Sequence, residues 1–196
     1  MADHSLVLDL ALTIRHDGHG GVADDLDQAE GLTRWVREHA AAPGADGFVA
    51  DDAALSSVRA LRAAVRTLFA HAVRPGPPSA ADADRLLPVE AALDLLNRTA
   101  AAVPTVPRLE WPTGADPYLE HRADAAPDAV TALCAALARA AVEFLAGPDR
   151  EKLRACHGPR CVRYFLKEHP RQEWCKPSCG NRARVARHQQ RRRVPA

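Results

Sequence analysis

The chain of 196 residues is poor in aromatic side chains, and it has no lysine before position 152. Aromatic residues make up 5% of a sequence that is 47% hydrophobic, and alanine supplies the largest share of the apolar content, which favours helices. No apolar run approaches the roughly 18 residues needed to cross a bilayer. The first 12 residues have no basic stretch before their apolar run. We therefore expect a cytoplasmic chain with no export signal and no membrane partner.

The formal net charge of +1 conceals a division between the two ends of the chain. Residues 1–149 hold 12 arginines against 22 acidic residues, a net charge of −10. Residues 150–196 hold 14 basic residues against three glutamates, a net charge of +11. This asymmetry predicts an acidic body over 1–148 and a basic unit over 149–196 that binds a polyanion.

Apolar residues that recur every three or four positions predict a mainly helical body. The run SLVLDLALTI at 5–14 fits either a strand or the first buried turn of a helix. Asp24 or Asp25 could cap a helix that ends near Glu38. Asp51 or Asp52 precedes a long helix that stops at the following RPGPP, and a further helix is predicted over 127–145.

Two segments between these helices are harder to assign. Ser79 is a suitable N-cap for a helix that contains several leucines, which Pro88 would either kink or begin. VPRLEW and YLEHRA, separated by the turn-rich PTGADP, predict a β-hairpin.

Four of the five cysteines lie near the C-terminus in two close pairs, with four residues inside the first pair, three inside the second and thirteen between them. This spacing is typical of a chain that wraps a tetrahedral zinc ion with thiolates. Two disulfides are the alternative, but a cytosolic chain keeps its thiols reduced. His157 and His169 could each replace one sulfur. The predicted ligands are Cys156, Cys161, Cys175 and Cys179.

Zinc would also stabilise a unit too small to bury enough surface by itself. Its large apolar side chains are Val162, Tyr164, Phe165, Leu166 and Trp174. The three aromatic ones are predicted to form a small core around the metal rather than platforms for base stacking. Four sulfurs indicate a structural rather than a catalytic zinc. Cys134, which lies on an apolar helical pattern, is predicted to be a core residue.

The stretch WCKPSCGNRARVARH, residues 174–188, resembles the CGNR zinc finger, and CHGPRC at 156–161 matches the first cysteine pair of that family. Upstream, LVLDLALTI, TRWV, VRALRAAVRTLF and LDLLN follow in the order found in the ABATE-type domain of bacterial proteins described as stress-induced transcription regulators. The chain departs from the family at Leu12-Thr13, where Asn-Thr is common, and in the finger loop LKEHPRQE. The resemblance implies that the four cysteines bind zinc and that the finger binds DNA.

Ser178 could cap a basic helix that begins near Cys179 and runs to about Arg192. Such a polar helix has little to bury and can enter a DNA groove. Asn181 could contact adenine, although a hydrogen bond to the backbone of the zinc site is favoured. Arginines of the first two turns are predicted to contact bases and those of the last turn phosphates. The candidate DNA-binding residues are Asn181, Arg182, Arg184, Arg187, His188, Arg191, Arg192 and Arg193.

The segment RHDGHGG supplies a second candidate site, in which His16, Asp17 and His19 could imitate a metal or acid/base site and Arg15, His16 and His19 could line a ligand pocket. As a catalytic site it lacks an identifiable third partner, and a glycine-rich turn explains it equally well. We therefore expect no enzyme, and we keep these residues as a pocket for a small-molecule effector.

The predicted fold is mainly α, with a helical N-terminal domain that can include a small β-hairpin and a treble-clef-like or knuckle zinc finger that ends in a basic helix. The predicted function is a bacterial transcription regulator that binds double-stranded DNA at the nucleoid, with zinc as its cofactor. Its body would sense a ligand or form a homodimer. An RNA-binding protein and a zinc-stabilised protein-interaction module are the alternatives.

Overall fold

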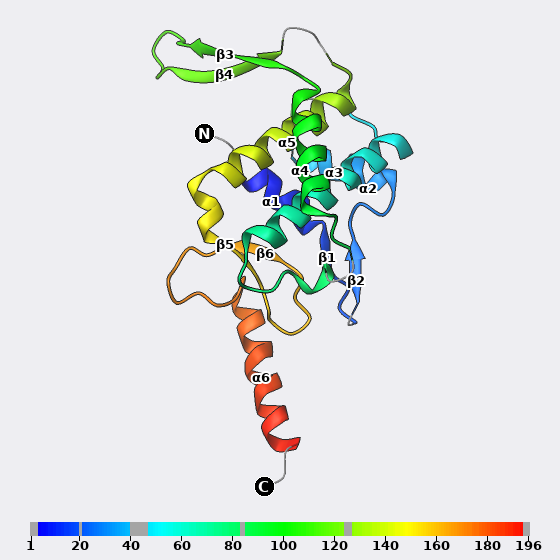
Figure 1. Ribbon diagram of the computed structural model, residues 1–196, viewed down its shortest axis with the longest axis vertical. Helices are drawn as coiled ribbons and strands as arrows, with labels where there is room; N and C mark the ends of the chain where they lie inside the picture. Colours follow the sequence, from blue (N-terminus) through cyan, green and yellow to red (C-terminus); the bar gives the residue numbers. More distant parts are fainter. Residues whose placement is uncertain (1–3, 20, 40–46, 83–84, 124–126, 194–196) are drawn as a thin grey trace.

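The computed structural model describes residues 4–19, 21–39, 47–82, 85–123 and 127–193 (Figure 1). Helices α1 (His4–Leu12), α3 (Asp52–Ala72), α4 (Val89–Ala101) and α5 (Ala129–Ala146) pack against one another as the body. Helix α2 (Ala29–Glu38) packs on α3. The mainly helical fold is thus confirmed, and the opening run forms a helix followed by a short strand.

Local sequence signals explain where the two longest body helices begin. Asp51 caps α3 by accepting a hydrogen bond from the Ala54 amide at 2.7 Å, and Asp128 caps α5 by accepting one from the Thr131 amide at 2.9 Å. Apolar residues on one side of each helix meet in a common core. Fully buried members of this core include Leu10, Phe69, Leu133, Leu137 and Phe144.

In the part of the chain that the structure describes, three two-stranded antiparallel hairpins are attached to the helices. Strands β1 (Ile14–His16) and β2 (Val22–Asp24) follow α1, and the segment RHDGHGG contributes Arg15 and His16 to β1. Strands β3 (Thr105–Glu110) and β4 (Tyr118–Ala123) form the predicted hairpin, which extends from the end of the body remote from the C-terminus (Figure 1).

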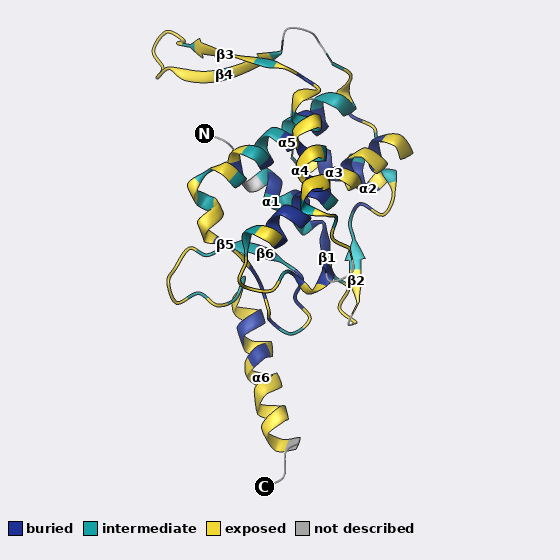
Figure 2. Cartoon of the chain, in the orientation of Figure 1, coloured by how far each residue is buried: buried dark blue, intermediate teal, exposed yellow. Residues whose placement is uncertain are grey.

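The third hairpin belongs to the C-terminal unit. A 3-10 turn, η2 (Pro148–Lys152), leads from α5 into β5 (Leu153–Ala155), which pairs with β6 (Tyr164–Leu166). Helix α6 (Pro177–Arg193) then projects away from the body, and most of its side chains are exposed (Figure 2). A hairpin followed by a helix, with cysteines at both, is the treble-clef-like finger that was predicted.

Three predicted helix starts are wrong. Asp24 caps no helix because it lies in β2, and α2 begins at Ala29 with Gln28 as its N-cap. Ser79 precedes only one 3-10 turn, η1 (Ala80–Asp82), whereas α4 begins directly after Pro88, which confirms the alternative start at that proline. Helix α6 begins at Pro177, so Ser178 lies inside it. Proline suits a first helical position because its missing N–H would be unpaired there anyway.

Helix α5 is long and apolar enough, by length and composition, to cross a membrane, which the sequence analysis did not expect. Such a helix is weak support for a membrane span because core helices share these properties. In the structure Leu133, Leu137, Ala138, Ala141 and Phe144 of α5 are fully buried in the body core. Its buried apolar residues are therefore explained by packing against α1, α3 and α4.

Candidate metal centre and nucleic-acid interface

The two cysteine pairs meet at one point of the finger. Cys156 directly follows β5, Cys161 precedes β6, and Cys175 and Cys179 flank the start of α6. Their four Sγ atoms lie within 4.8 Å of one another. Cys175 Sγ lies 3.6 Å from both Cys161 Sγ and Cys179 Sγ. A zinc–sulfur distance of about 2.3 Å gives a tetrahedron with edges of about 3.8 Å, so the cluster fits zinc.

A tight turn brings the first cysteine pair together. The Cys161 amide donates to the Gly158 carbonyl at 2.8 Å, and the Cys156 amide donates to the Arg163 carbonyl at 2.9 Å. Arg160 adopts a left-handed conformation with φ of 62°. A Cβ atom on Gly158 would lie only 2.8 Å from Cys179 Cβ. Glycine at this position therefore lets the turn approach the first turn of α6.

The thiols influence one another strongly. Hydrogen bonds from the Cys161 and Cys175 thiols and from backbone amides lower the pKa of Cys156. Hydrogen bonds to Cys156 and Cys161, together with burial and like charge, raise the pKa of Cys175. The hydrogen bond to Cys156 likewise raises the pKa of Cys161 to about 11. Four thiolates this close would repel one another, and a divalent cation removes that repulsion. The donor set is thus suited to zinc, which would hold the turn and the helix together.

Arg182 supports the cluster from α6. Its Nε donates a hydrogen bond to the Pro159 carbonyl at 3.0 Å, and its Nη2 donates to Cys179 Sγ at 3.1 Å. The guanidinium therefore ties the helix to the cysteine turn and places a positive charge beside a metal-binding sulfur. The sequence analysis grouped Arg182 with the DNA-contacting residues, but its donors point toward the finger itself.

Aromatic residues divide between the finger and the body. Trp174 and Phe165 pack against the buried cysteines, as predicted. A Cβ atom on Gly180 would lie 2.9 Å from Trp174 Cδ1, so glycine lets the indole ring rest on α6. Tyr164 was assigned wrongly to this small core. It is buried in the body core, with its ring centroid 5.5 Å from that of Phe69.

Hydrogen bonds join the finger to the body at two further points. Tyr164 Oη donates to Asp82 Oδ2 at 2.7 Å, and Ser79 Oγ donates to the Val162 carbonyl at 2.8 Å. Burial, together with the nearby charge of Asp82, raises the pKa of Tyr164, so its hydroxyl stays protonated and can donate. The finger is therefore anchored on the body by buried polar contacts.

The remaining candidate DNA contacts lie along α6. Asn181 Oδ1 accepts a hydrogen bond from Arg184 Nη2 at 2.6 Å, so it faces along the helix rather than toward the cysteine turn. Residues four apart share a helix face, and residues three apart lie close to it. This spacing gathers four exposed side chains into a stripe, which we call the basic stripe: Arg184, Arg187, His188 and Arg191. Arg192 lies at its edge, and the side chain of Arg193 is outside the described residues.

The second candidate site is not assembled as predicted. Arg15 pairs with Asp25, and the His19 amide donates to Asp17 Oδ1 at 2.7 Å. His16 Nδ1 accepts a hydrogen bond from the Gly18 amide at 2.8 Å, while its buried Nε2 has no partner among the described residues. His16 lines a small pocket beside Cys156 and Cys161, whereas Arg15 and His19 do not.

Sequence reasoning missed a set of body residues with functional potential. Arg62 and Arg66 are 5% and 4% exposed, although they occupy positions of the apolar stripe of α3. Buried arginines require partners, and Asp24 and Asp82 provide them. The sequence signal for these ion pairs was the presence of two arginines at positions of the apolar stripe. Their partners lie 38 and 16 residues away and could not be identified from it.

Comparison with known families agrees with these observations. The family model described as "Putative stress-induced transcription regulator", ABATE, matches residues 4–148, and the CGNR zinc finger model matches residues 152–192. Both describe regulator or zinc-finger types rather than enzymes. A search of curated proteins finds no match. A CGNR finger with four clustered cysteines is a zinc-binding module. The chain therefore belongs to the ABATE family, described as above, and carries a CGNR zinc finger at its C-terminal end.

Proposed function

We propose that this chain is a bacterial transcription regulator that binds double-stranded DNA through α6, in the cytoplasm at the nucleoid. One zinc ion held by Cys156, Cys161, Cys175 and Cys179 fixes the start of that helix. The body senses a small-molecule effector and forms a homodimer. The observation that carries the proposal is the basic stripe on an exposed helix that contains no acidic residue.

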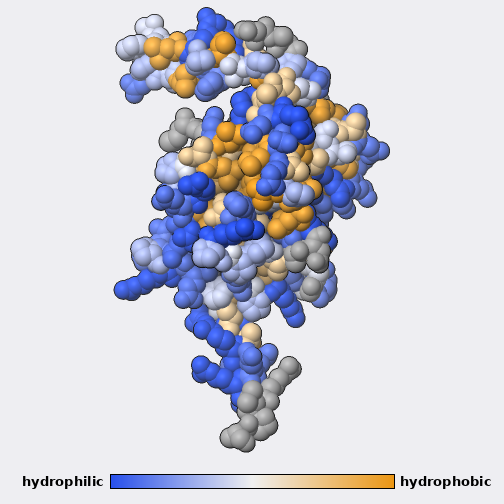
Figure 3. Space-filling model, viewed as in Figure 1, coloured by the Kyte–Doolittle hydropathy of each residue, from blue (hydrophilic) through white to orange (hydrophobic). Residues whose placement is uncertain are grey.

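The shape of α6 suits a DNA groove. Its 17 residues span about 25 Å, and it projects beyond the body as a hydrophilic rod (Figures 1 and 3). A major groove accepts one α-helix, and arginine can pair with phosphates or with guanine O6 and N7. Within the basic stripe, Arg184 and Arg187 lie nearest the zinc site, where the helix is held most firmly, so we assign base contacts to them. Arg191, Arg192 and Arg193 are assigned to phosphates.

RNA binding is the weaker alternative. Recognition of single-stranded RNA uses exposed aromatic rings on which bases stack. Both aromatic residues beside the zinc site, Phe165 and Trp174, pack against the cysteine cluster. These two rings are therefore not free to stack on bases, and the finger would contact a nucleic acid mainly through its basic helix.

The β3–β4 hairpin supports dimerisation. Its register places Leu109 opposite Leu119 and Pro107 opposite His121, while the other face pairs Arg108 with Glu120 and Val106 with Arg122. Leu109 and Leu119 are 69% and 61% exposed. A two-stranded hairpin with an uncovered apolar face is marginally stable in water. A second copy of this chain would cover that face and would place two fingers on paired DNA half-sites.

Light scattering during gel filtration tests the dimer. The wild type should elute as a dimer, and the double variant Leu109→Asp/Leu119→Asp should be a monomer because charges would be buried in the interface. Val106→Asp introduces the same charge on the other face and should stay dimeric. A monomeric wild type, or a dimeric double variant, would exclude this surface.

Fluorescence anisotropy with labelled DNA tests the main proposal. Zinc-loaded protein should bind duplexes from its own promoter region with a Kd of about 10⁻⁸ M or tighter. Binding should weaken steeply with salt, because arginine–phosphate contacts release counterions. Chelation should abolish binding by releasing α6 from the cysteine turn. Equal affinity for duplex DNA after zinc removal would refute the assigned role of the metal.

A further inference from the structure

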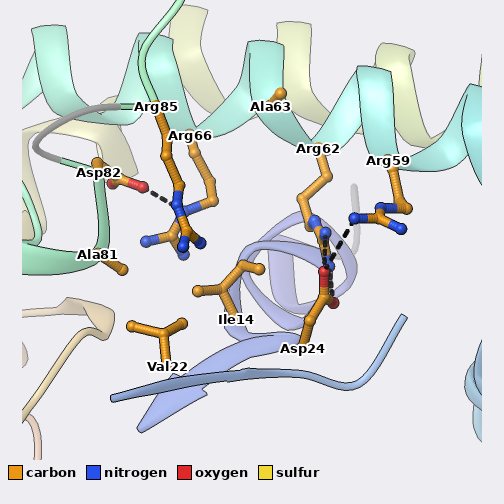
Figure 4. A pocket seen from close by; sticks show the side chains of 10 residues that line it. All are labelled: Ile14, Val22, Asp24, Arg59, Arg62, Ala63, Arg66, Ala81, Asp82 and Arg85. Carbon is orange, nitrogen blue, oxygen red and sulfur yellow. Dashed lines mark hydrogen bonds and ion pairs between the residues drawn. The ribbon is translucent and has the colours of Figure 1, made fainter. Parts of the chain in front are cut away.

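A pocket of about 470 Å³ opens on the body between α3, the β1–β2 hairpin and η1 (Figure 4). Four arginines and two aspartates line it, which gives an excess of two positive charges. This excess contrasts with the net charge of −10 of residues 1–149. The charged side chains are Arg59, Arg62, Arg66, Arg85, Asp24 and Asp82.

Two of the arginines are committed to buried ion pairs. Arg62 donates to both carboxylate oxygens of Asp24 at 2.6 and 2.7 Å, and Arg66 Nε donates to Asp82 Oδ1 at 2.7 Å. Partial burial disfavours ionised Asp24, but hydrogen bonds from Arg62 and its positive charge outweigh this effect and lower the pKa of Asp24. These pairs form a rigid charged lining.

The other two arginines retain donors for a ligand. Arg59 Nη2 approaches Asp24 only to 3.9 Å and is half exposed. Arg85 reaches into the pocket beside Arg66 and pairs with no carboxylate among the described residues (Figure 4). Ile14 lies between the two charged groups, and it forms an apolar wall together with Val22 and Ala81, which lie on the side of Asp82. Such a combination suits a small organic molecule that carries an acidic group.

Three residues that line the pocket also contact the zinc finger. Asp82, which binds Arg66, also accepts the hydrogen bond from Tyr164 of β6. Ile14 and Ala81 of the apolar wall pack against Val162, which follows the ligand Cys161. A change in the folding of the finger must therefore alter the side chains that line the pocket.

We propose that this pocket binds a small organic oxyanion, a carboxylate or a phosphate ester, through Arg59 and Arg85, and that its affinity depends on the folded zinc finger. This site would be where the body senses its effector, but neither the site nor its test depends on DNA binding. Binding energies of two sites coupled in this way are reciprocal, so finger folding and anion binding favour each other.

Isothermal titration of the full-length, zinc-loaded chain tests the site, with inorganic phosphate, glycerol phosphate and succinate as probes. At least one probe should bind with one site per chain, and its identity distinguishes phosphate from carboxylate chemistry. Arg59→Gln and Arg85→Gln should each raise the Kd roughly tenfold, because each removes a charged hydrogen-bond donor. Arg37→Gln makes the same charge change on α2, outside the pocket, and should leave the Kd unchanged.

A second titration tests the coupling. Zinc-depleted protein should bind the same probe at least severalfold more weakly than zinc-loaded protein. The proposal is overturned if no probe binds stoichiometrically, if both arginine variants bind like the wild type, or if zinc depletion leaves the Kd unchanged. These titrations contain no DNA, so they test the anion site even if the chain does not bind DNA.

Discussion

Arg182 donates hydrogen bonds to the cysteine turn and to a metal-binding sulfur, and both bonds use the guanidinium that DNA would otherwise contact. Groups that hydrogen-bond to a metal ligand fix its orientation and tune its charge. Arg184, only two residues further along α6, instead bonds to Asn181 on the exposed surface. Neighbouring arginines of one helix therefore serve different purposes.

Replacing Arg182 by Gln should lower zinc affinity by about 10- to 100-fold, since Cys179 loses a charged donor. Competition with a chromophoric chelator measures this change. Arg184→Gln removes the same charge without touching a cysteine and should leave zinc affinity unaltered. Equal zinc affinities for both variants would show that the bond to Cys179 is incidental.

The five thiols should react in two distinct steps, four after zinc removal and one after denaturation. Cys134 is buried in the body, and burial raises its pKa to about 11, so it should stay protonated and unreactive at neutral pH. Mass spectrometry after brief alkylation should find no label on the zinc-loaded protein, four labels after chelation and five after denaturation. Labelling of Cys134 in the native protein would contradict its assignment to the core.

Tyr164→Phe should destabilise the protein by about 1–2 kcal/mol, because Asp82 keeps its buried carboxylate and loses one donor. Urea unfolding measures the difference. Tyr118→Phe deletes the same hydroxyl at an exposed hairpin position and should change stability by less than about 0.5 kcal/mol. Similar values for the two variants would mean that the bond between Tyr164 and Asp82 contributes nothing.

At the scale of elements, α6 packs against the finger only near its start, and the rest of the helix is exposed to solvent. Cys179 and Ala183 are buried near its start, whereas the basic stripe faces solvent. Contacts near the zinc site should be precise, and contacts near the C-terminal end should depend mainly on charge.

Alanine substitutions along α6 should therefore fall into two classes. Arg187→Ala should cost about 1–3 kcal/mol on the preferred duplex and less on a scrambled one. Arg192→Ala should weaken both duplexes equally and reduce the salt slope by about one unit. Arg150→Ala, in η2, is the charge-matched control and should change neither. Equal losses on both duplexes for every α6 variant would make the helix a purely electrostatic anchor.

Sequence patterns predicted the elements whose signals are local and missed those decided by tertiary contacts. Asp51 bonds to an amide three residues away, so its role could be inferred from the sequence. Asp24 was predicted as a helix cap on the same grounds, but its carboxylate instead accepts hydrogen bonds from Arg62, 38 residues away. Ser79 likewise donates to Val162, 83 residues along the chain. The cysteine spacing indicated the zinc cluster, whereas the bond from Arg182 to the Pro159 carbonyl, 23 residues away, could not be inferred from the sequence.

At the scale of the whole molecule, the finger is packed into the body. Leu153, Ala155 and Tyr164 of its hairpin belong to the body core, and Val162 packs on Ile14. The division into units 1–148 and 149–196 stays a prediction, and these contacts show that the core is built from both sides of position 148. Loss of the finger should therefore affect the body.

Cys175→Ser should lose zinc and retain most of the helical circular dichroism, since the body helices do not depend on the metal. Its free energy of unfolding should nevertheless fall by about 2 kcal/mol, and its urea midpoint with it, because finger side chains are then less well buried in the body core. Ser178→Ala, in the same segment but not a ligand, should leave the midpoint in place. A Cys175→Ser protein as stable as the wild type would show that body and finger are energetically independent.

Selection of bound sequences from random duplex DNA tests the central claim most directly, because it asks whether the zinc-anchored helix recognises a sequence. Zinc-loaded wild-type protein should enrich one motif, with two half-sites if the dimer binds. The triple variant Arg184→Ala/Arg187→Ala/Arg191→Ala, which lacks the arginines of the basic stripe, should enrich none. A wild-type pool that stays random, or the same motif recovered with the triple variant, would contradict recognition of DNA by α6.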